Sequence, residues 1–252
     1  MDHAADPSHP RYRSLLMRHR LEVAAKKGML ADSAMIAHGR GEAYDYLLGE
    51  TTIPSADVAA QIALQALMQA KQPVLSVNGN VVALAGDEML QLADKIGCPL
   101  EVNIFYRTPE RMDALLTDLN ERKERLALNV DILGANPDAT IPGLKGPRAK
   151  CESEGILQAD TILVPLEDGD RCEALVAMGK TVIVIDLNPL SRSSQRGSIT
   201  IVDELSRCLE NMLAMETDTL PSLETYDHPQ TLQGALNAIV DGMKNKFSEA
   251  ER

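Results

Sequence analysis

A cluster of polar side chains follows one of the most apolar stretches of the chain. Val182–Ile185 is a run of β-branched apolar residues, which predicts a buried strand. The polar residues that follow it are Asp186, Asn188, Arg192, Ser193 and Ser194. A carboxylate here can accept hydrogen bonds from ribose hydroxyls, while an arginine and serine hydroxyls can hold phosphate oxygens. Helix capping would explain only one or two of the five, so we expect a nucleotide-type ligand at this strand end.

A second candidate is the segment His38-Gly39-Arg40-Gly41-Glu42, which places three ionisable groups around two glycines. Glycines allow close approach to a ligand, and the planar guanidinium of Arg40 suits phosphate. A turn between helices with solvated charges is the alternative. The segment is not a dinucleotide fingerprint, because Tyr44 stands where the third glycine is needed, and the chain contains no P-loop motif.

Three carboxylates occur within four positions at Glu167, Asp168 and Asp170, directly after the apolar run Thr161–Pro165. Such a cluster can hold a divalent cation, a ribose or a cationic ligand group. Capping of a helix that begins here would equally favour acidic residues. We expect Asp168 and Asp170 to be the metal-binding candidates.

Asn78 and Asn80 follow the predicted strand Val74–Val77, and Arg107 follows another at Leu100–Phe105. Both segments could instead be an Asn-Gly turn and a helix cap with one surface arginine. The chain has only seven Phe or Tyr residues, and five of them lie in or beside the candidate segments: Tyr12, Tyr44, Tyr46, Phe105 and Tyr106. We therefore expect one shared cleft. No nucleophile elbow is present, which favours catalysis by positioning and charge stabilisation.

The elements that position these residues alternate along most of the chain. Helices are expected at Arg11–Lys27 and Ser55–Ala70, with a turn and a short helix at 35–49 between them. Further strands are expected within Leu126–Leu133 and at Ser198–Val202. Further helices are expected at Asp87–Ile96, Pro109–Arg122, after Asp203 and at Gln230–Phe247. This alternation predicts an α/β fold with a mainly parallel sheet flanked by helices. We expect a single domain over 1–252, divided into a helical segment 1–72, an alternating core 73–216, and a linker with a peripheral helix 217–252.

Composition limits the class of protein. The formal net charge of −12 argues against sequence-independent nucleic-acid binding, which needs a basic surface. No apolar run is long enough to cross a bilayer, and the first residues do not resemble a secretory signal. The four cysteines show no metal-ligand spacing and are expected to be buried thiols. A cytoplasmic protein without membrane or nucleic-acid partners is expected.

Seven runs along the chain form one ordered set: Ser8–Tyr12, Ile36–Ala43, Ser76–Asn80, Phe105–Thr108, Ile141–Leu144, Val164–Arg171 and Ile185–Arg192. In content and order they resemble the archaeal 4-phosphopantoate–β-alanine ligases, also called phosphopantothenate synthetases, and the resemblance extends from about residue 8 to residue 216. The resemblance implies a Rossmann-like, homodimeric enzyme of coenzyme A biosynthesis. Such enzymes use ATP to join (R)-4-phosphopantoate to β-alanine, giving 4′-phosphopantothenate, AMP and diphosphate.

The resemblance also implies which residues hold the nucleotide. They are Arg18, Arg40, Asp186, Leu187, Asn188, Arg192, Ser193, Glu204 and Leu205. Two positions depart from the family pattern. Lys145-Gly-Pro-Arg148 replaces a common Glu-His-Glu-Arg run, and Glu204 stands where the family often has asparagine. We expect the substrates to contact Asn78, Asn80, Arg107, Arg148 and Lys150.

Release of AMP implies an acyl-adenylate intermediate, whose formation needs stabilisation of charge at the α-phosphate. Arg40, Arg192 and a Mg²⁺ ion near Asp168 or Asp170 could supply it. His38 is the candidate base for the β-alanine amine. The alternatives are an ATP-binding regulatory module of similar fold without turnover, and a Rossmann-type oxidoreductase, against which the missing glycine fingerprint counts.

Overall fold

The computed structural model describes residues 6–250, with side chains up to residue 244. The ends of the proposed 1–252 domain, residues 1–5 and 251–252, lie outside the described residues. Among the described residues, no helix is both long and apolar enough to span a membrane.

A six-stranded parallel sheet forms the centre of the fold, with the strand order β3-β2-β1-β6-β7-β8. Its strands are β1 (Pro73–Val77), β2 (Leu100–Val102), β3 (Ile132–Leu133), β6 (Thr161–Pro165), β7 (Thr181–Ile185) and β8 (Ile199–Ile201). The order along the sheet reverses between β1 and β6. This is the arrangement of a doubly wound, Rossmann-like sheet, and the expected fold class is confirmed. Ligands of such sheets bind outside the carboxyl ends of the strands, near the reversal.

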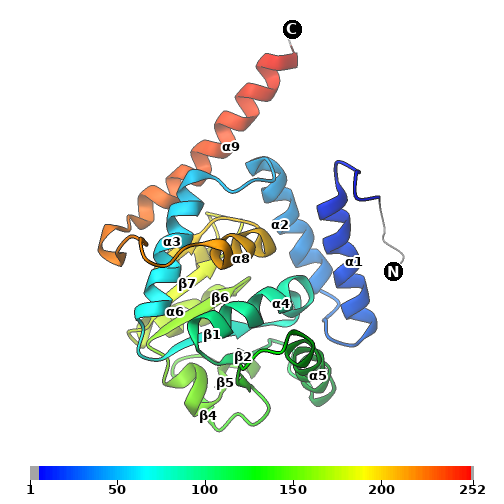
Figure 1. The fold of residues 1–252 in the computed structure, drawn as a ribbon, viewed down its shortest axis with the longest axis vertical. Helices are drawn as coiled ribbons and strands as arrows, with labels where there is room; N and C mark the ends of the chain where they lie inside the picture. Colours follow the sequence, from blue (N-terminus) through cyan, green and yellow to red (C-terminus); the bar gives the residue numbers. More distant parts are fainter. Residues whose placement is uncertain (1–5, 251–252) are drawn as a thin grey trace.

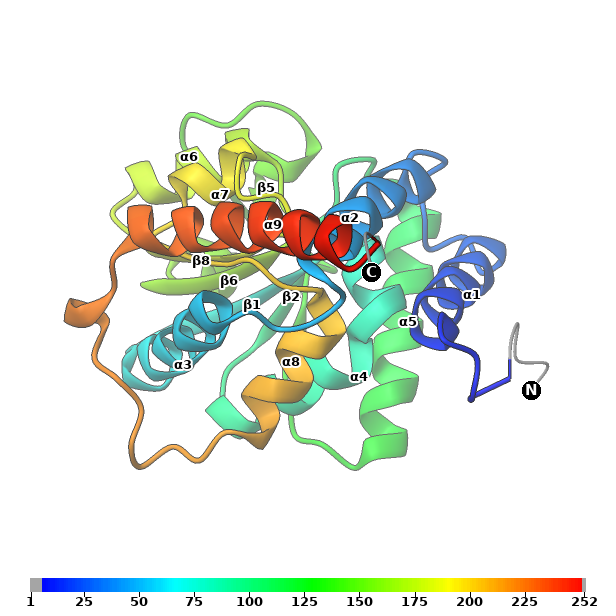
Figure 2. The same cartoon turned by 90° about the horizontal axis from the view of Figure 1, so that it is seen from above.

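Helices cover both faces of the sheet. Figure 2 shows α6 and α7 on one side of the strands and α3, α4, α5 and α8 on the other, while α9 extends away from the body in Figure 1. The helices are α1 (Tyr12–Lys26), α2 (Ala34–Leu48), α3 (Pro54–Gln69), α4 (Gly79–Ile96), α5 (Pro109–Leu126), α6 (Gly169–Ala177), α7 (Arg192–Arg196), α8 (Leu205–Ala214) and α9 (His228–Ala250). A short ribbon of β4 (Ala139–Thr140) and β5 (Lys150–Cys151) lies beside the main sheet, and short helical turns occur at Pro147–Ala149, Ser153–Leu157 and Leu223–Thr225.

The core follows from the alternation of side chains along the strands. In β6, Leu163 packs into the larger apolar cluster with α3, α4 and α8, while Ile162 and Val164 pack into a second cluster with α6. Strands that are buried on both faces are expected to be continuously apolar, and β6 and β7 are. The four cysteines are free and buried, as expected.

Several element boundaries differ from the sequence prediction. The turn expected at 35–49 is instead part of the continuous helix α2, which ends at Gly49 in a left-handed conformation. Helix α4 begins at Gly79 rather than Asp87, because the side chain of Asn78 accepts a hydrogen bond from the Val81 amide and caps the helix directly after β1. Strands β2 and β3 are shorter than expected.

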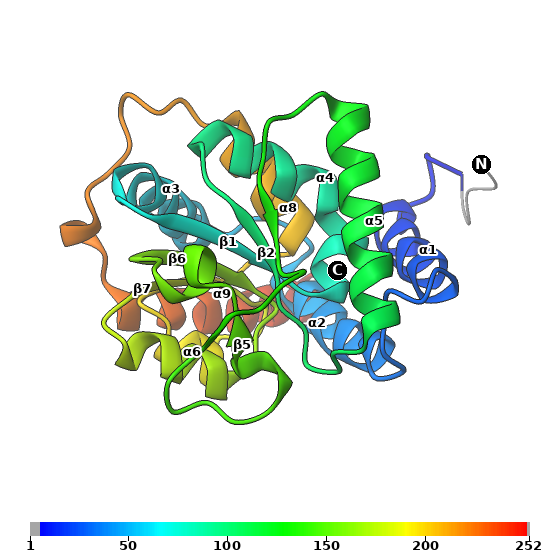
Figure 3. The same ribbon diagram turned by 90° about the horizontal axis from the view of Figure 1, so that it is seen from below.

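Helices α1 and α2 form a layer at one end of the sheet. Figures 1 and 3 place both on the side of the molecule that carries α4 and α5, and both helices contact α4. This layer faces the carboxyl ends of the strands and provides one wall of the candidate site.

Candidate active site

A cavity of about 400 Å³ lies at the carboxyl ends of the strands. Residues that follow five different strands line it: Asn78 after β1, Phe105 after β2, Leu166 after β6, Leu187 after β7 and Glu204 after β8. Helices α1 and α2 supply the opposite wall. The cavity therefore lies at the reversal of strand order, where this fold binds its ligands.

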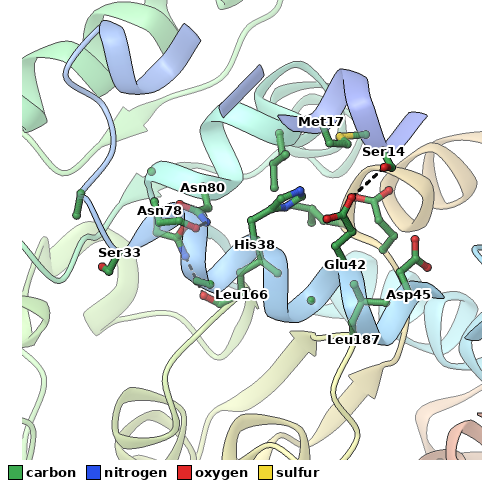
Figure 4. Close-up of a pocket in the computed structure, with 18 of the residues that line it drawn as sticks. Ser14, Met17, Ser33, His38, Glu42, Asp45, Asn78, Asn80, Leu166 and Leu187 are labelled. Carbon is green, nitrogen blue, oxygen red and sulfur yellow. Dashed lines mark hydrogen bonds between the residues drawn. The ribbon is translucent and has the colours of Figure 1, made fainter. Parts of the chain in front are cut away.

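One face of α2 carries the polar residues of that wall. Gly41 and Glu42 are three and four residues after His38, and Asp45 follows them at the same spacings, so all four lie on the same side of the helix and line the cavity. Figure 4 shows His38 between the two asparagines after β1 and the acidic residues of α2. The two glycines are not turn residues. Gly41 lies against the β7 loop, where a Cβ would make an ordinary contact with the Leu187 side chain at 3.5 Å.

Three of the acidic residues that line the cavity, Glu42, Asp45 and Glu204, are paired with arginines. Glu42 accepts from Arg18 at 2.7 Å and from Ser14 at 2.9 Å, and the first of these bonds helps lower the pKa of Glu42 although burial alone would raise it. Asp45 accepts from Arg207 at 2.6 Å. Glu204 lies 3.4 Å from Arg13.

His38 is the half-buried imidazole of the site. Its Nε2 atom is buried and has no hydrogen-bond partner among the described residues. Burial lowers the pKa of His38, and the nearby carboxylate of Glu42 opposes this shift only in part. At neutral pH the imidazole is therefore uncharged and can accept a proton.

The two asparagines after β1 line the cavity but are also part of the fold. The Asn78 amide donates to the Leu166 carbonyl at 3.0 Å, so its side chain joins the ends of β1 and β6 in addition to capping α4. The Asn80 amide donates to the Ala34 carbonyl at 3.1 Å and so fixes the start of α2. These bonds hold both walls of the cavity together (Figure 4).

The loop after β7 is braced by its own polar side chains. The Asp186 carboxylate accepts hydrogen bonds from the Ser191 hydroxyl at 2.5 Å and from the backbone N–H of Asn188 at 3.0 Å. Burial raises the pKa of Asp186, and the positive charge of Arg40 opposes that shift, which places Arg40 near this carboxylate. Ser193 donates to the Glu167 carbonyl at 2.6 Å and links the loop to the end of β6.

The acidic segment after β6 lies in a buried cluster of charges. The Glu167 carboxylate contacts both Arg148 and Arg171, and Arg171 also donates to the Ser76 hydroxyl at 2.9 Å. Burial lowers the pKa of Arg148 and of Arg171 to about 10. Asp168 caps α6 and lies 2.6 Å from Arg148. Of this cluster, Arg148 reaches the cavity.

Comparison with known proteins identifies the family. Residues 55–242 match the sequence model of the phosphopantothenate/pantothenate synthetase family. A protein of Thermococcus onnurineus named 4-phosphopantoate–β-alanine ligase is 47% identical over 242 residues, which cover 93% of this chain and 91% of the relative. Proteins of Methanosarcina mazei and Thermococcus kodakarensis with the same name are each 45% identical to this chain. Each alignment covers 96% of this chain, and it covers 96% of the Methanosarcina protein and 94% of the Thermococcus kodakarensis protein. The chain belongs to this family.

The structure brings some of the residues expected for a synthetase together and leaves others outside the cavity. Those that line it are His38, Asn78, Asn80, Arg148, Leu187, Glu204 and Leu205. Those that do not line it are Arg18, Arg40, Arg107, Lys150, Asp168, Asp170, Asp186, Asn188, Arg192 and Ser193. Of the outer set, Arg18 acts on the cavity through Glu42, and Arg107 donates to the Gly134 carbonyl at 2.5 Å. The ligand contacts proposed for the outer set remain predictions.

The metal candidates both have arginine partners. Asp168 lies beside Arg148, and Asp170 pairs with the exposed Arg192. Within residues 6–244, whose side chains are described, there is no group of three or more His, Cys, Asp or Glu side chains placed to hold a metal ion. Mg²⁺ that arrives with a nucleotide commonly uses only one or two protein carboxylates, so the assignment of Asp168 and Asp170 stays a prediction.

Four arginines of the cavity were not anticipated as site residues from the sequence: Arg11, Arg13, Arg111 and Arg207. Arg13 and Arg207 are paired with acids from other elements. Arg111 lies in the first turn of α5, which begins after the Thr108 cap. Its position just after the Phe105–Thr108 motif was the available signal, because the first turn of a helix after a parallel strand faces the ligand crevice.

Proposed function

We propose that this protein is an ATP-dependent ligase that joins (R)-4-phosphopantoate to β-alanine and releases 4′-phosphopantothenate, AMP and diphosphate. The observation that carries the proposal is similarity, over nearly the full length of both chains, to relatives named 4-phosphopantoate–β-alanine ligase. The cavity at the strand ends, with a neutral imidazole and arginines on its walls, supplies groups suited to this chemistry. A role in coenzyme A biosynthesis follows from the product.

The reaction divides into two steps. In the first, a carboxylate oxygen of phosphopantoate attacks the α-phosphorus of ATP, and diphosphate leaves. Arg40 and Arg192, beside the β7 loop, are the proposed residues for stabilising the charge that develops there. In the second, the β-alanine amine attacks the acyl carbon and AMP leaves. His38 takes the proton from the amine, because its Nε2 atom is buried in the cavity wall without a partner.

The proposed cofactors are ATP and Mg²⁺. We infer that the β7 loop and the start of α8 hold the nucleotide, since Leu187, Glu204 and Leu205 line the cavity there. When bound, Mg²⁺ would neutralise charge on the phosphates, with Asp168 and Asp170 as its proposed protein contacts. A regulatory module that binds ATP without turnover is not favoured, because the similarity to relatives named as ligases extends over nearly their whole length.

The products distinguish this proposal from its alternatives. Incubation with ATP, Mg²⁺, phosphopantoate and β-alanine should release AMP and diphosphate in a one-to-one ratio with the amide product. Chromatographic quantification of nucleotides would measure this. Stoichiometric ADP and phosphate would indicate an acyl-phosphate route instead, and ATP binding without any product would leave only the regulatory module.

We also propose that the enzyme is a cytoplasmic homodimer without membrane or nucleic-acid partners. Apolar side chains are exposed on α2 and α9, which contact each other: Ile36 is 69% exposed, and Val240 and Met243 are 42% and 40% exposed. Sedimentation at micromolar concentration should give about twice the 27.4 kDa chain mass. Ile36→Glu should shift the protein toward monomer, whereas Val176→Glu on α6 should not. A wild-type monomer at all concentrations would refute the dimer.

A further inference from the structure

One arginine of the cavity differs from all the others in how its charge is balanced. Arg11, Arg13, Arg148 and Arg207 each lie within 4.0 Å of a carboxylate. Arg111, which also lines the cavity, forms no ion pair with any acid in the described part of the chain.

Arg111 is nevertheless held firmly in place. Its two terminal nitrogens donate to main-chain carbonyls of different segments, to Tyr106 at 2.5 Å and to Met29 at 3.2 Å. Its Nε atom is buried and has no hydrogen-bond partner among the described residues. Neutral carbonyl groups orient a guanidinium but leave its charge uncompensated, and a partly buried charge without a counter-charge is unfavourable. An anionic ligand would remove this penalty.

The surroundings of Arg111 favour an anion as well. A Cβ on Gly79 would lie 3.4 Å from Arg111 Nη2 and 2.7 Å from the Met29 carbonyl, so the guanidinium lies against the first residue of α4. The first amides of a helix have no acceptor within the helix and carry a partial positive charge. A residue larger than glycine would clash with the Met29 carbonyl, which is one of the two acceptors that orient Arg111.

The position along the sheet indicates which anion binds. Arg111 lies on α5 beside the start of α4, next to β1 and β2. The loop proposed for ATP follows β7, which is separated from β1 by β6. The anion at Arg111 therefore belongs to the other substrate. Arg148, the deeply buried arginine of the cavity, is already neutralised by Glu167 and Asp168.

We propose that Arg111 binds the phosphate of the phosphorylated hydroxy acid and thereby makes the enzyme select 4-phosphopantoate over pantoate. This inference rests on the proposed ligase function. It addresses a distinction that the family description leaves open, because that description covers both phosphopantothenate and pantothenate synthetases.

The test compares the two acids in matched variants. In Arg111→Gln, kcat/KM for 4-phosphopantoate should fall about 10- to 150-fold, the range for loss of a charged hydrogen bond, while kcat/KM for pantoate stays the same. Arg111→Lys keeps the charge but loses the planar fork, so it should retain part of the selectivity. Arg125→Gln, on the same helix but exposed and paired with Asp87, is the control and should leave selectivity unchanged.

Each other outcome overturns the inference. An increase in KM for ATP with unchanged selectivity would place a nucleotide phosphate at Arg111. An equal decrease of kcat/KM for both acids in Arg111→Gln would mean that Arg111 binds the carboxylate or supports the fold. Calorimetric binding of 4-phosphopantoate and pantoate, without ATP, makes the same comparison independently of turnover. If the wild-type enzyme forms no product, the proposed ligase function is wrong. The role of Arg111 is judged separately by the binding measurement, and it is wrong if the wild-type protein binds 4-phosphopantoate and pantoate equally.

Discussion

A Glu167→Gln variant should lose about 3–5 kcal/mol of unfolding free energy, the usual effect of removing one partner from a buried ion pair. The Glu167 side chain is only 2% exposed and lies between Arg148 and Arg171, of which Arg171 is 1% exposed. Glutamine keeps the volume but removes the charge. Arg171 would then remain buried with the Ser76 hydroxyl as its main short-range partner. Because each kcal/mol shifts the Tm of a chain of this size by about 2–4 °C, calorimetry should detect a decrease of about 6–20 °C.

The matched control is Asp170→Asn. Asp170 lies three residues after Glu167 and also pairs with an arginine, Arg192. This pair is exposed, because the Asp170 side chain is 71% exposed and the Arg192 side chain is 54% exposed. Exposed pairs contribute about 0–1 kcal/mol. If both variants melt at the wild-type temperature, the buried cluster does not stabilise the fold as its burial implies.

The order of elements was predictable from the sequence because the strands of this sheet consist mostly of apolar residues and end in polar residues. The runs Val74–Val77, Thr161–Pro165 and Val182–Ile185 coincide with β1, β6 and β7 to within one residue. Since parallel strands bring their carboxyl ends to one edge of the sheet, the polar residues after them were expected to share a cleft. Asn78 does line the cavity, together with Leu187 and Glu204, whereas the polar residues Asp186, Asn188 and Arg192 after β7 do not.

Glycine and asparagine were the least reliable signals. Gly39 and Gly41 suggested a turn, but helix α2 continues through both, and a helix tolerates glycine at a cost of about 1 kcal/mol each. Gly41 lies beside Leu187, a neighbour 146 positions away in the sequence that no local pattern encodes. Asn78 suggested a ligand contact, and its side chain is at least partly committed to capping α4.

The charge pairing of the site could not be predicted because it joins distant segments. Asp45 pairs with Arg207, and Arg148 pairs with Glu167 and Asp168 across the sheet. The lack of any such partner distinguishes Arg111 from the other cavity arginines, and it becomes visible only when all the acids are placed. Asp186, expected to contact a ribose, and Asn188, expected to hold the nucleotide, form hydrogen bonds within their own loop.

His38→Gln should lower the rate of amide formation by about 10²–10⁴-fold, the usual contribution of a general base. Glutamine has a similar size and can still form hydrogen bonds in the cavity, but it cannot accept the proton from the β-alanine amine. The first step does not use this base. Exchange of label between diphosphate and ATP, with phosphopantoate present and β-alanine absent, should therefore continue at close to the wild-type rate. His19→Gln on α1, outside the cavity lining, is the control for a histidine replacement.

The pH dependence provides a second test of the same role. Burial lowers the pKa of His38 below its ordinary value of 6.5, so the folded enzyme keeps this imidazole neutral at pH values where an exposed histidine would already be protonated. Amide formation should then lose its base only as the pH falls below 6.5, and NMR titration should show one histidine, missing from His38→Gln, with a pKa below 6.5. If His38→Gln slows the diphosphate exchange as much as amide formation, His38 supports adenylation or substrate binding instead. If neither rate changes, the amine loses its proton to another group.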